Sequence, residues 1–326
     1  MRIVVVGAGR MGEIRAEDLS ADGRVDDIVV TNRSLARAEE LASRVGGRAV
    51  PWGEWPDADA YAVTTTTDTH ADLLEALVPL GRPLLVEKPL AMTLEETDAL
   101  IDLAGDVTMQ IGFQRRFDAG IRTIKDAIDS GRLGVLYTMT LVAHDRTPGS
   151  PEYIASSGGT FRDMLVHDLD LARWLSGADI DTVYATGTVR HHPDYAAAGD
   201  HDVVAVHLTM ASGVPVLISG TRHDPVGHDI RMEAFGSQDS ITAGFNRRTP
   251  IHVADGDLPV DEDPYAGFMD RFRAAFAAET SAFVDVVRGE RDNPCPPEES
   301  RAALAAAIAC EVSAREGRPV GMAEVG

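Results

Sequence analysis

The sequence predicts an α/β domain with a doubly wound parallel sheet, followed by an α+β domain with an open, mostly antiparallel sheet. In residues 1–112, β-rich runs alternate with helical segments, an order typical of parallel strands joined by helical crossovers. From about residue 134, six β-rich runs follow with short turns in place of most helices, which is typical of antiparallel pairing. The chain has 326 residues, 44% of them apolar, which is enough for two hydrophobic cores. We expect these domains in residues 1–112 and 113–326.

Five short apolar runs should form the strands of the first domain. They are RIVVVG (2–7), DDIVVT (26–31), DAYAVT (59–64), RPLLVE (82–87) and VTMQIG (107–112). Segments such as AEELASRV (38–45) and HADLLEALVPL (70–80) separate them and have helical periodicity. Helices should therefore cover both faces of this sheet.

The second domain should contain six strands and three main helical segments. The strand-like runs are VLYTMTLVAHD (135–145), TVYATGTVR (182–190), DVVAVHLTMA (202–211), VPVLISGTR (214–222), IRMEAFGS (230–237) and SITAGF (240–245). One helix is expected between the first two runs, and helical blocks at 270–289 and 299–317 close the chain. We expect these helices on one face of the open sheet.

Composition argues against several classes of function. The formal net charge of −22 would repel nucleic-acid phosphates and anionic lipid, so we expect neither partner. No stretch approaches the roughly 18 apolar residues of a membrane span. The two cysteines, Cys295 and Cys310, have no metal-binding spacing and fit a reducing compartment. We expect a cytoplasmic protein.

A glycine-rich turn follows the first predicted strand. The segment GAGRMG places Gly7, Gly9 and Gly12 between a strand and a helical segment, the context that a dinucleotide-binding turn requires. The first glycine permits the tight turn, the second admits a pyrophosphate, and the third lets the helix pack on the sheet. We therefore predict a Rossmann domain in which these glycines, with Arg10 and Met11, contact the cofactor.

The end of the second strand distinguishes the two nicotinamide cofactors. An acidic residue is expected there for the ribose hydroxyls of NAD, but the sequence has Asn32, Arg33 and Ser34. A guanidinium and a hydroxyl suit a 2′-phosphate. The sequence therefore predicts a preference for NADP over NAD.

Four chemically distinctive side chains recur at helical spacing in the segment GGTFRDMLVHDLDLARWL (158–175). On an α-helix, Asp163, His167, Asp170 and Trp174 would share a stripe about 60° wide, surrounded by apolar residues. Carboxylates and an imidazole on a buried helix need partners or a cleft. Three interpretations fit the residues: a structural network, a metal site, or an acid/base pair in a substrate cleft.

Several motifs together resemble the Gfo/Idh/MocA oxidoreductases, most closely the inositol 2-dehydrogenase branch. They are the glycine turn, TTTTDTH (64–70), VEKP (86–89), GFQRRFD (112–118) and GGTFRDMLVHDLDLARWL, in this order. The resemblance covers nearly the whole chain. It implies transfer of a hydride between NADP or NAD and a secondary alcohol of a cyclic polyol or sugar, by a homodimer or homotetramer.

The resemblance also implies three catalytic residues. Lys88, one of only two lysines, would lie beside the nicotinamide ribose and the reacting hydroxyl. His167 would exchange the hydroxyl proton and Asp163 would orient the imidazole. Further cofactor contacts are expected from Thr65, Thr66, His70, Glu87 and Lys88, with Glu87 also holding the ammonium. Since nicotinamide carries the hydride, no metal is expected here.

Substrate contacts are expected from Arg115, His144, Arg146, Asp170 and His228. Trp174 is expected in core packing, and whichever of Arg115 and Arg116 does not face the cleft is expected to pair with an acid such as Asp118. Two features depart from the inositol enzymes: Arg146 stands where proline is common, and Val226 and His228 stand where tyrosines are common. A site without these phenols leaves the choice among cyclic polyols, inososes and sugars open.

Two alternatives to the dehydrogenase remain at this point. One is a cofactor-binding sensor or scaffold without turnover, although it would not require Lys88, Asp163 and His167 together. The other is a different reaction on the same fold that uses tightly held NAD.

Overall fold

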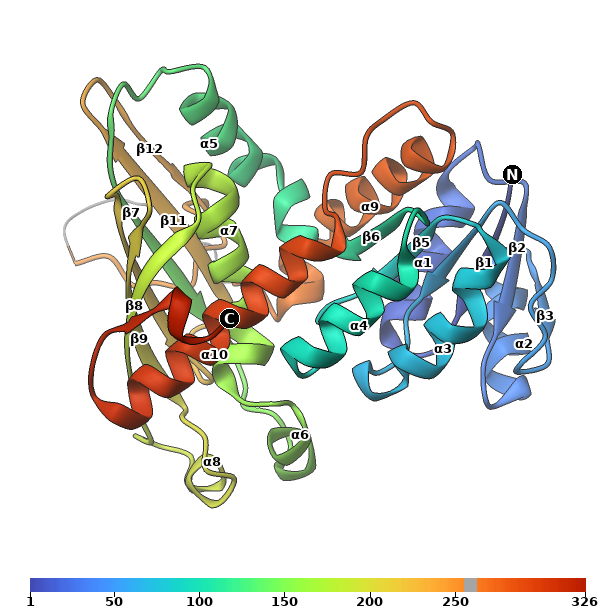
Figure 1. The fold of residues 1–326 in the computed structure, drawn as a ribbon, viewed down its shortest axis with the longest axis horizontal. Coiled ribbons are helices and arrows are strands. Elements are labelled where there is room, and N and C mark those ends of the chain that lie inside the picture. Colours follow the sequence, from blue (N-terminus) through green and yellow to red (C-terminus); the bar gives the residue numbers. More distant parts are fainter. Residues whose placement is uncertain (255–262) are drawn as a thin grey trace. The chain divides into compact units, whose positions relative to one another are not determined.

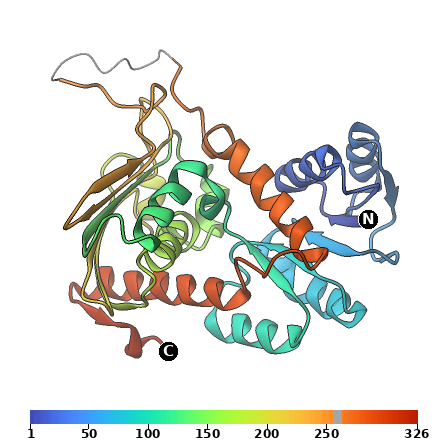
Figure 2. The same ribbon diagram turned by 90° about the horizontal axis from the view of Figure 1, so that it is seen from above.

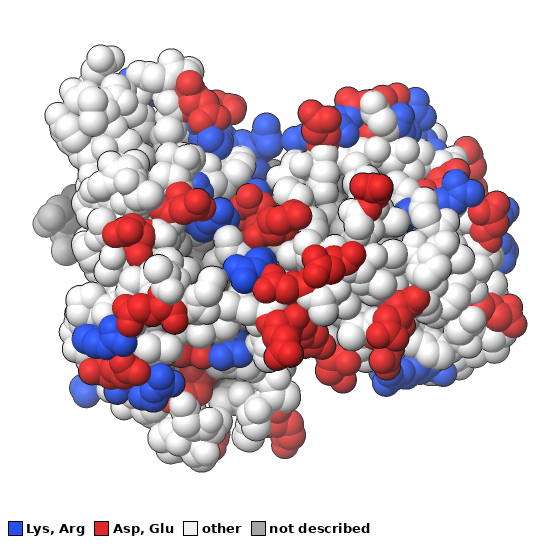
Figure 3. All heavy atoms as spheres, viewed as in Figure 1, with Lys and Arg blue, Asp and Glu red and all other residues white. Residues whose placement is uncertain are grey.

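The computed structural model describes residues 1–254 and 263–326, which form two compact units (Figure 1). The first comprises Met1–Phe117 and Ala274–Ala302, and the second comprises Asp118–Arg273 and Ala303–Gly326. Within the described ranges, no helix is both long and apolar enough to cross a membrane. Acidic side chains are spread over the face seen in Figure 3, with basic ones between them.

The first unit contains a six-stranded parallel sheet in the order β3-β2-β1-β4-β5-β6, which is the strand order of a Rossmann domain. Its strands are β1 (Arg2–Val6), β2 (Asp27–Thr31), β3 (Arg48–Val50), β4 (Ala60–Val63), β5 (Leu84–Glu87) and β6 (Met109–Gly112). The five predicted strands are confirmed. The edge strand β3 was missed because it has only three residues.

Four helices connect these strands. They are α1 (Arg10–Ala21), α2 (Leu35–Val45), α3 (His70–Leu77) and α4 (Leu94–Ala104). Local signals fix their ends: the hydroxyl of Thr93 accepts the Glu96 amide at 3.2 Å and begins α4, while Gly46 ends α2 at a φ of 70°.

The second unit is built on a seven-stranded sheet in the order β12-β11-β7-β10-β9-β8-β13. Its strands are β7 (Leu136–His144), β8 (Ile180–Thr188), β9 (Val203–Met210), β10 (Pro215–Thr221), β11 (Asp229–Gly236), β12 (Ser240–Ala243) and β13 (Val320–Gly321). Neighbours pair antiparallel except β7 and β10, which are parallel. The predicted, mostly antiparallel sheet is confirmed.

Helices cover one face of this sheet (Figure 2). The helices of the unit are α5 (Ala119–Asp129), α6 (Pro151–Ser156), α7 (Val166–Ser176), α8 (Pro193–Ala197) and the C-terminal part of α10 (Pro297–Glu316). Along β8, β9 and β10, buried and exposed side chains alternate. Such alternation means that the sheet has one core face and one open face.

Residues 274–302 lie in the first unit, although the sequence assigned them to the second domain. Most of α9 (Phe268–Val287) belongs there because Phe283 and Val284 join the core around Ile3 and Leu19. The division falls next to Phe272, where the backbone leaves helical geometry at φ −113° and ψ 16°. Apolar periodicity alone could not show that one helix serves two cores.

Candidate active site

The glycine turn of the first unit has the geometry that the motif requires. Gly7 has a φ of 112°, a conformation that favours glycine. A Cβ on Gly12 would lie 2.0 Å from the Gly7 carbonyl oxygen, so only glycine lets α1 approach β1 this closely. Gly9 precedes α1, and a Cβ there would meet open space. The exposed N-terminus of α1 is therefore suited to a phosphate.

The segment after β2 lies against this turn. The side-chain oxygen of Asn32 accepts the Ala8 amide at 3.1 Å and joins the two loops. Arg33 lies over the Trp52 ring, with its guanidinium carbon 5.7 Å from the ring centroid. Ser34 occupies the N-cap of α2, but its hydroxyl makes no capping hydrogen bond. A guanidinium and an uncommitted hydroxyl thus stand beside the glycine turn.

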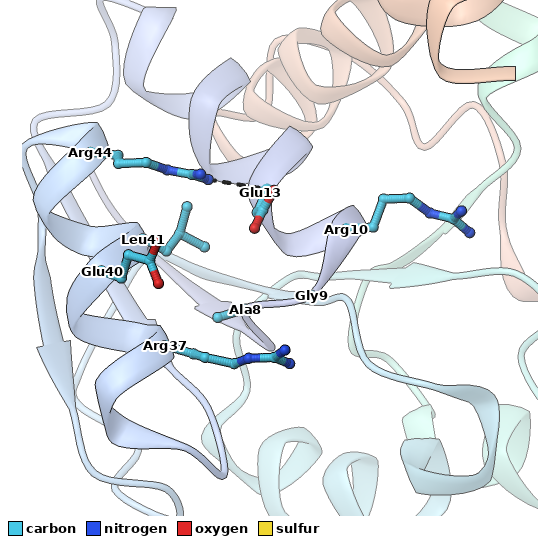
Figure 4. A pocket seen from close by; sticks show the side chains of 8 residues that line it. All are labelled: Ala8, Gly9, Arg10, Glu13, Arg37, Glu40, Leu41 and Arg44. Atoms are coloured by element: carbon cyan, nitrogen blue, oxygen red, sulfur yellow. Dashed lines mark ion pairs between the residues drawn. The ribbon is translucent and has the colours of Figure 1, made fainter. Parts of the chain in front are cut away.

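A cavity of about 260 Å³ opens between α1 and α2. Figure 4 shows Arg37 extending from α2 beneath the turn that holds Gly9, while Arg10 points away from α2. Arg44 on the far side is 3.5 Å from Glu13. The cavity is lined by Ala8, Gly9, Arg10, Glu13, Arg37, Glu40, Leu41 and Arg44.

The loop after β4 supports the turn from below. The hydroxyl of Thr64 donates to the carbonyls of Val6 and Gly7, at 3.0 and 3.1 Å. The Thr69 hydroxyl donates to that of Thr65 at 2.7 Å, and Thr66 lies just before the 3₁₀ turn.

His70 lies beneath that loop and is only 1% exposed. Its Nδ1 donates to the Leu90 carbonyl at 3.0 Å, and burial lowers its pKa. Neutral His70 therefore holds the segment that follows Lys88.

A buried ionic cluster fixes the Glu87–Lys88 segment. Arg15, which is fully buried, donates from Nε to Glu87 at 2.9 Å and from Nη2 to Glu279 at 2.5 Å. Its Nη1 donates to the Thr280 hydroxyl at 3.1 Å. This cluster was not predicted because its members lie far apart in the chain. Glu87 is thus engaged by Arg15, and Lys88 follows as a half-buried side chain.

The two arginines after β6 are both buried. Arg116 donates to Glu299 at 2.7 Å and to the Pro294 carbonyl at 3.2 Å, so its acidic partner is Glu299. Asp118, which the sequence suggested for that pairing, accepts from Arg271 at 2.7 Å in the second unit. Arg115 is 5% exposed.

Asp163 of the second unit is held from two sides. Its Oδ2 accepts from Arg222 Nη2 and from the Tyr153 hydroxyl, both at 2.8 Å. Arg222 is 6% exposed, and its Nη1 donates to Asp145 at 3.1 Å. The sequence singled out neither Tyr153 nor Arg222. Arg222 is thus the partner of the Asp163 carboxylate, which the sequence indicated would need a partner or a cleft.

The sequence predicted that Asp163 and His167 share a stripe on one α-helix, and this prediction is wrong. Residues Phe161–Leu165 form a π-helical turn, and α7 begins only at Val166. A π turn is wider than an α turn and changes the direction in which its side chains point. His167 is 8% and Asp170 is 1% exposed.

Trp174, at the end of the expected stripe, contacts α5. The ammonium of Lys125 lies 5.8 Å from the centre of its ring. Lys125 also pairs with Asp129 at 2.5 Å. Trp174 is half-buried and contacts the side chain of Lys125 on α5.

Asp145 links Arg222, the partner of Asp163, to His228, one of the predicted substrate residues. Burial alone would raise its pKa, but a hydrogen bond from His228 and the charge of Arg222 lower it. His228 is 2% exposed, with Nδ1 3.4 Å from Asp145. His228, Asp145, Arg222, Asp163 and Tyr153 thus form one continuous polar chain.

Two further predicted substrate residues lie at the end of β7. His144 Nε2 is 3.1 Å from the Ser219 hydroxyl, and its Nδ1 is 3.6 Å from Asp224. Burial lowers the pKa of His144. Arg146 is exposed.

Each of the two units matches a known protein-family model. Residues 1–113 match the model of an oxidoreductase family with an NAD-binding Rossmann fold, and residues 121–242 match that of the GFO/IDH/MocA C-terminal domain. The chain belongs to the Gfo/Idh/MocA family. It is therefore an NAD-binding oxidoreductase, as the motifs predicted.

Full-length relatives of this Gfo/Idh/MocA protein carry related names. An inositol 2-dehydrogenase of Rhizobium meliloti is 34% identical over 99% of both chains. A myo-inositol dehydrogenase of Streptomyces leeuwenhoekii is 36% identical over 97% of this chain and 98% of the relative. The crystal structure of a myo-inositol dehydrogenase from Corynebacterium glutamicum superimposes with a TM-score of 0.90 at 34% identity over 98% of each chain. These relatives favour a dehydrogenase over a sensor.

Proposed function

We propose that this oxidoreductase is a dehydrogenase of a secondary alcohol in a cyclic polyol or related sugar, with inositol-like polyols as the first substrates to test. The observation that carries the proposal is Asp163, held by Arg222 and Tyr153 just before the buried His167. The inositol dehydrogenase names of the full-length relatives support the substrate class.

We assign cofactor binding to the first unit and substrate binding to the second. The residues of the first unit fit a dinucleotide, since Gly12 allows the close approach of α1 and Gly9 leaves open space at the helix N-terminus. Gly7 and Met11 complete this turn, and Thr65 and Thr66 belong to the loop that supports it. When bound, the nicotinamide ring supplies the hydride acceptor or donor.

Lys88, Asp163 and His167 are the proposed catalytic residues. Imidazole titrates near neutral pH, so His167 can accept the proton of the substrate hydroxyl and return it in the reverse direction. Asp163 would orient His167, and Arg222 and Tyr153 would orient Asp163. The ammonium of Lys88 would stabilise negative charge developing on the substrate oxygen.

Hydroxyl recognition is proposed for Arg115, His144, Arg146, Asp170 and His228. A substrate hydroxyl both donates and accepts hydrogen bonds, and imidazole and carboxylate groups match that pattern. His228 is already bonded to Asp145, so it would present its other nitrogen to a substrate. A polyol with several ring hydroxyls suits such a set better than an apolar alcohol.

A spectrophotometric screen tests the function. Purified enzyme is incubated with myo-inositol, scyllo-inositol, other cyclic polyols and aldoses, and formation of reduced nicotinamide is followed. Turnover with at least one cyclic polyol is expected, and His167→Ala should abolish most of it. Intact nucleotide binding without turnover across the panel would contradict the proposal.

We propose NADP as the preferred cofactor because Arg33 and Ser34 stand beside the glycine turn. A guanidinium can pair with a 2′-phosphate, whereas NAD offers no charge there. The ratio of kcat/KM for NADP to that for NAD should favour NADP and fall about 10- to 100-fold in Arg33→Ala, if one charged hydrogen bond is lost. Arg82→Ala, an exposed arginine paired with Asp57, is the control. A wild-type preference for NAD would refute this proposal.

The open face of the second sheet is the proposed surface for a homodimer or homotetramer. Tyr184, His207 and Leu217 are register partners in a row across β8, β9 and β10, and Leu217 is 49% exposed. Exposed apolar side chains on one sheet face favour association. Light scattering should show an oligomer, which Leu217→Glu should weaken. A wild-type monomer at micromolar concentration would contradict the proposed oligomer.

The buried free thiols of Cys295 and Cys310 fit the cytoplasmic location that we propose.

A further inference from the structure

Three histidines of the second unit meet outside the residues proposed for hydride transfer. His191 and His192 follow β8, and His223 follows β10. One nitrogen of each imidazole lies within 4.8 Å of the corresponding nitrogens of the other two. The ring centroids are 4.5 Å apart for His191 and His192, 4.9 Å for His192 and His223, and 5.4 Å for His191 and His223.

A single buried residue, Asp202, fixes both segments that carry these histidines. Its carboxylate accepts the amides of Arg190, His191 and His192, at 2.7, 2.8 and 2.8 Å. Its carbonyl oxygen accepts the amide of Arg222, the residue before His223, at 2.8 Å. Asp202 is 2% exposed. The backbones of all three histidines are therefore held in place by hydrogen bonds rather than by contacts between the rings.

The imidazoles themselves remain suited to a ligand. Nε2 of His192 is buried and has no hydrogen-bond partner among the described residues. A buried polar atom without a partner is uncommon and calls for an explanation. In a tetrahedral zinc site with Zn–N distances near 2.1 Å, ligand nitrogens lie about 3.4 Å apart. Because the nitrogens lie within 4.8 Å of one another, each pair needs to close by at most about 1.4 Å, which side-chain rotation supplies.

We propose that His191, His192 and His223 bind a divalent transition-metal ion of the zinc class, with a further coordination position open to water or a small ligand. An all-imidazole set favours Zn²⁺, Cu²⁺, Ni²⁺ or Co²⁺ over Mg²⁺ or Ca²⁺, which require oxygen ligands. The carboxylate of Asp202 is occupied by backbone amides and supports the ligands from outside. The site is independent of the proposed dehydrogenase function, because none of the three histidines is assigned to it.

Cobalt is the probe for the test because tetrahedral Co²⁺ absorbs visible light. Protein without a histidine tag is freed of metal with a chelator and titrated with Co²⁺, and Zn²⁺ is then added. We expect about one Co²⁺ per chain, visible bands of tetrahedral intensity, and displacement by Zn²⁺. Absence of stoichiometric binding up to about 100 µM Co²⁺ would overturn the proposal, since three well-placed imidazoles should bind more tightly than that.

Variants locate the ion. His192→Ala and His191→Ala should each weaken binding about 10- to 100-fold, as expected for loss of a ligand. Because His191 is exposed, its removal should leave the fold intact and circular dichroism unchanged. His144→Ala is the matched control, because His144, Asp224 and Asp229 form a second group, among the described residues, with ligand atoms within 4.8 Å of one another. Loss of binding in His144→Ala, or wild-type binding in His191→Ala and His192→Ala, would overturn the assignment.

Discussion

Glu279 should make the first unit less stable as the pH rises from acidic to neutral. It is fully buried, and burial raises its pKa from 4.5 to about 7, even though Arg15 beside it acts in the opposite direction. The nearby charge of Glu87 raises it further. The folded protein therefore holds a proton on Glu279 up to about pH 7, whereas the unfolded chain releases it near pH 4.5.

The sign and size of the effect follow from this difference. Between the two pKa values the folded state binds more protons than the unfolded state, so the free energy of unfolding falls as pH rises. A difference of about 2.5 pKa units corresponds to about 3 kcal/mol. Of this, about 2 kcal/mol should be lost between about pH 5.5 and about pH 8.5, a range that stays above the isoelectric point. Below pH 4.5 the contribution is complete.

The substitution Glu279→Gln isolates this contribution. Urea unfolding is followed by tryptophan fluorescence in a Trp174→Phe background, where the remaining tryptophans, Trp52 and Trp55, both lie in the first unit. The difference in unfolding free energy between parent and variant should change by about 2 kcal/mol across the pH range, with the parent losing more on the alkaline side. Glu75→Gln, an exposed glutamate, is the control. A difference that stays constant with pH would refute the reasoning.

Three further predictions concern the site. Arg222→Met should lower the free energy of unfolding by about 2–4 kcal/mol and kcat about 100-fold, because Asp163 loses its guanidinium partner. Urea unfolding measures the first effect and initial rates the second. An unchanged kcat would separate Asp163 from catalysis. Gly12→Ala should abolish cofactor binding in a fluorescence titration, since its Cβ would lie 2.0 Å from a backbone oxygen, whereas Gly23→Ala meets open space and should bind normally. His167→Ala should lower kcat about 10²- to 10⁴-fold, measured as initial rates on protein that circular dichroism shows to be folded. Near-normal turnover would return this histidine to a structural role.

Much of the fold could be predicted because the elements carry their own local signals. Continuous apolar runs separated by helical periodicity identified the strands of the first sheet, except the three-residue β3. Alternating burial along β9 and β10 reflects the period-two pattern visible in the sequence. The division of α9 between two units could not be predicted, since it depends on which core Phe283 joins.

The candidate site was only partly predictable. Motif residues such as Gly12 were found because their backbone geometry requires one residue type. The partners of Asp163 were missed, because Arg222 lies 59 residues away and Tyr153 is on a separate short helix. The π turn was missed as well, since no side-chain pattern distinguishes it from the start of an α-helix.

Two buried arginines each bond two carboxylates in this chain. Arg15 bridges Glu87 and Glu279, and Arg222 bridges Asp145 and Asp163. A planar guanidinium has five donors in a fixed fork and can bond two carboxylates at once, whereas an ammonium acts as a point charge. Each bridge also joins residues distant in sequence, so it fixes tertiary structure around a proposed catalytic group. A lysine at either position would leave one carboxylate less well bonded, which is a cost that rises with burial.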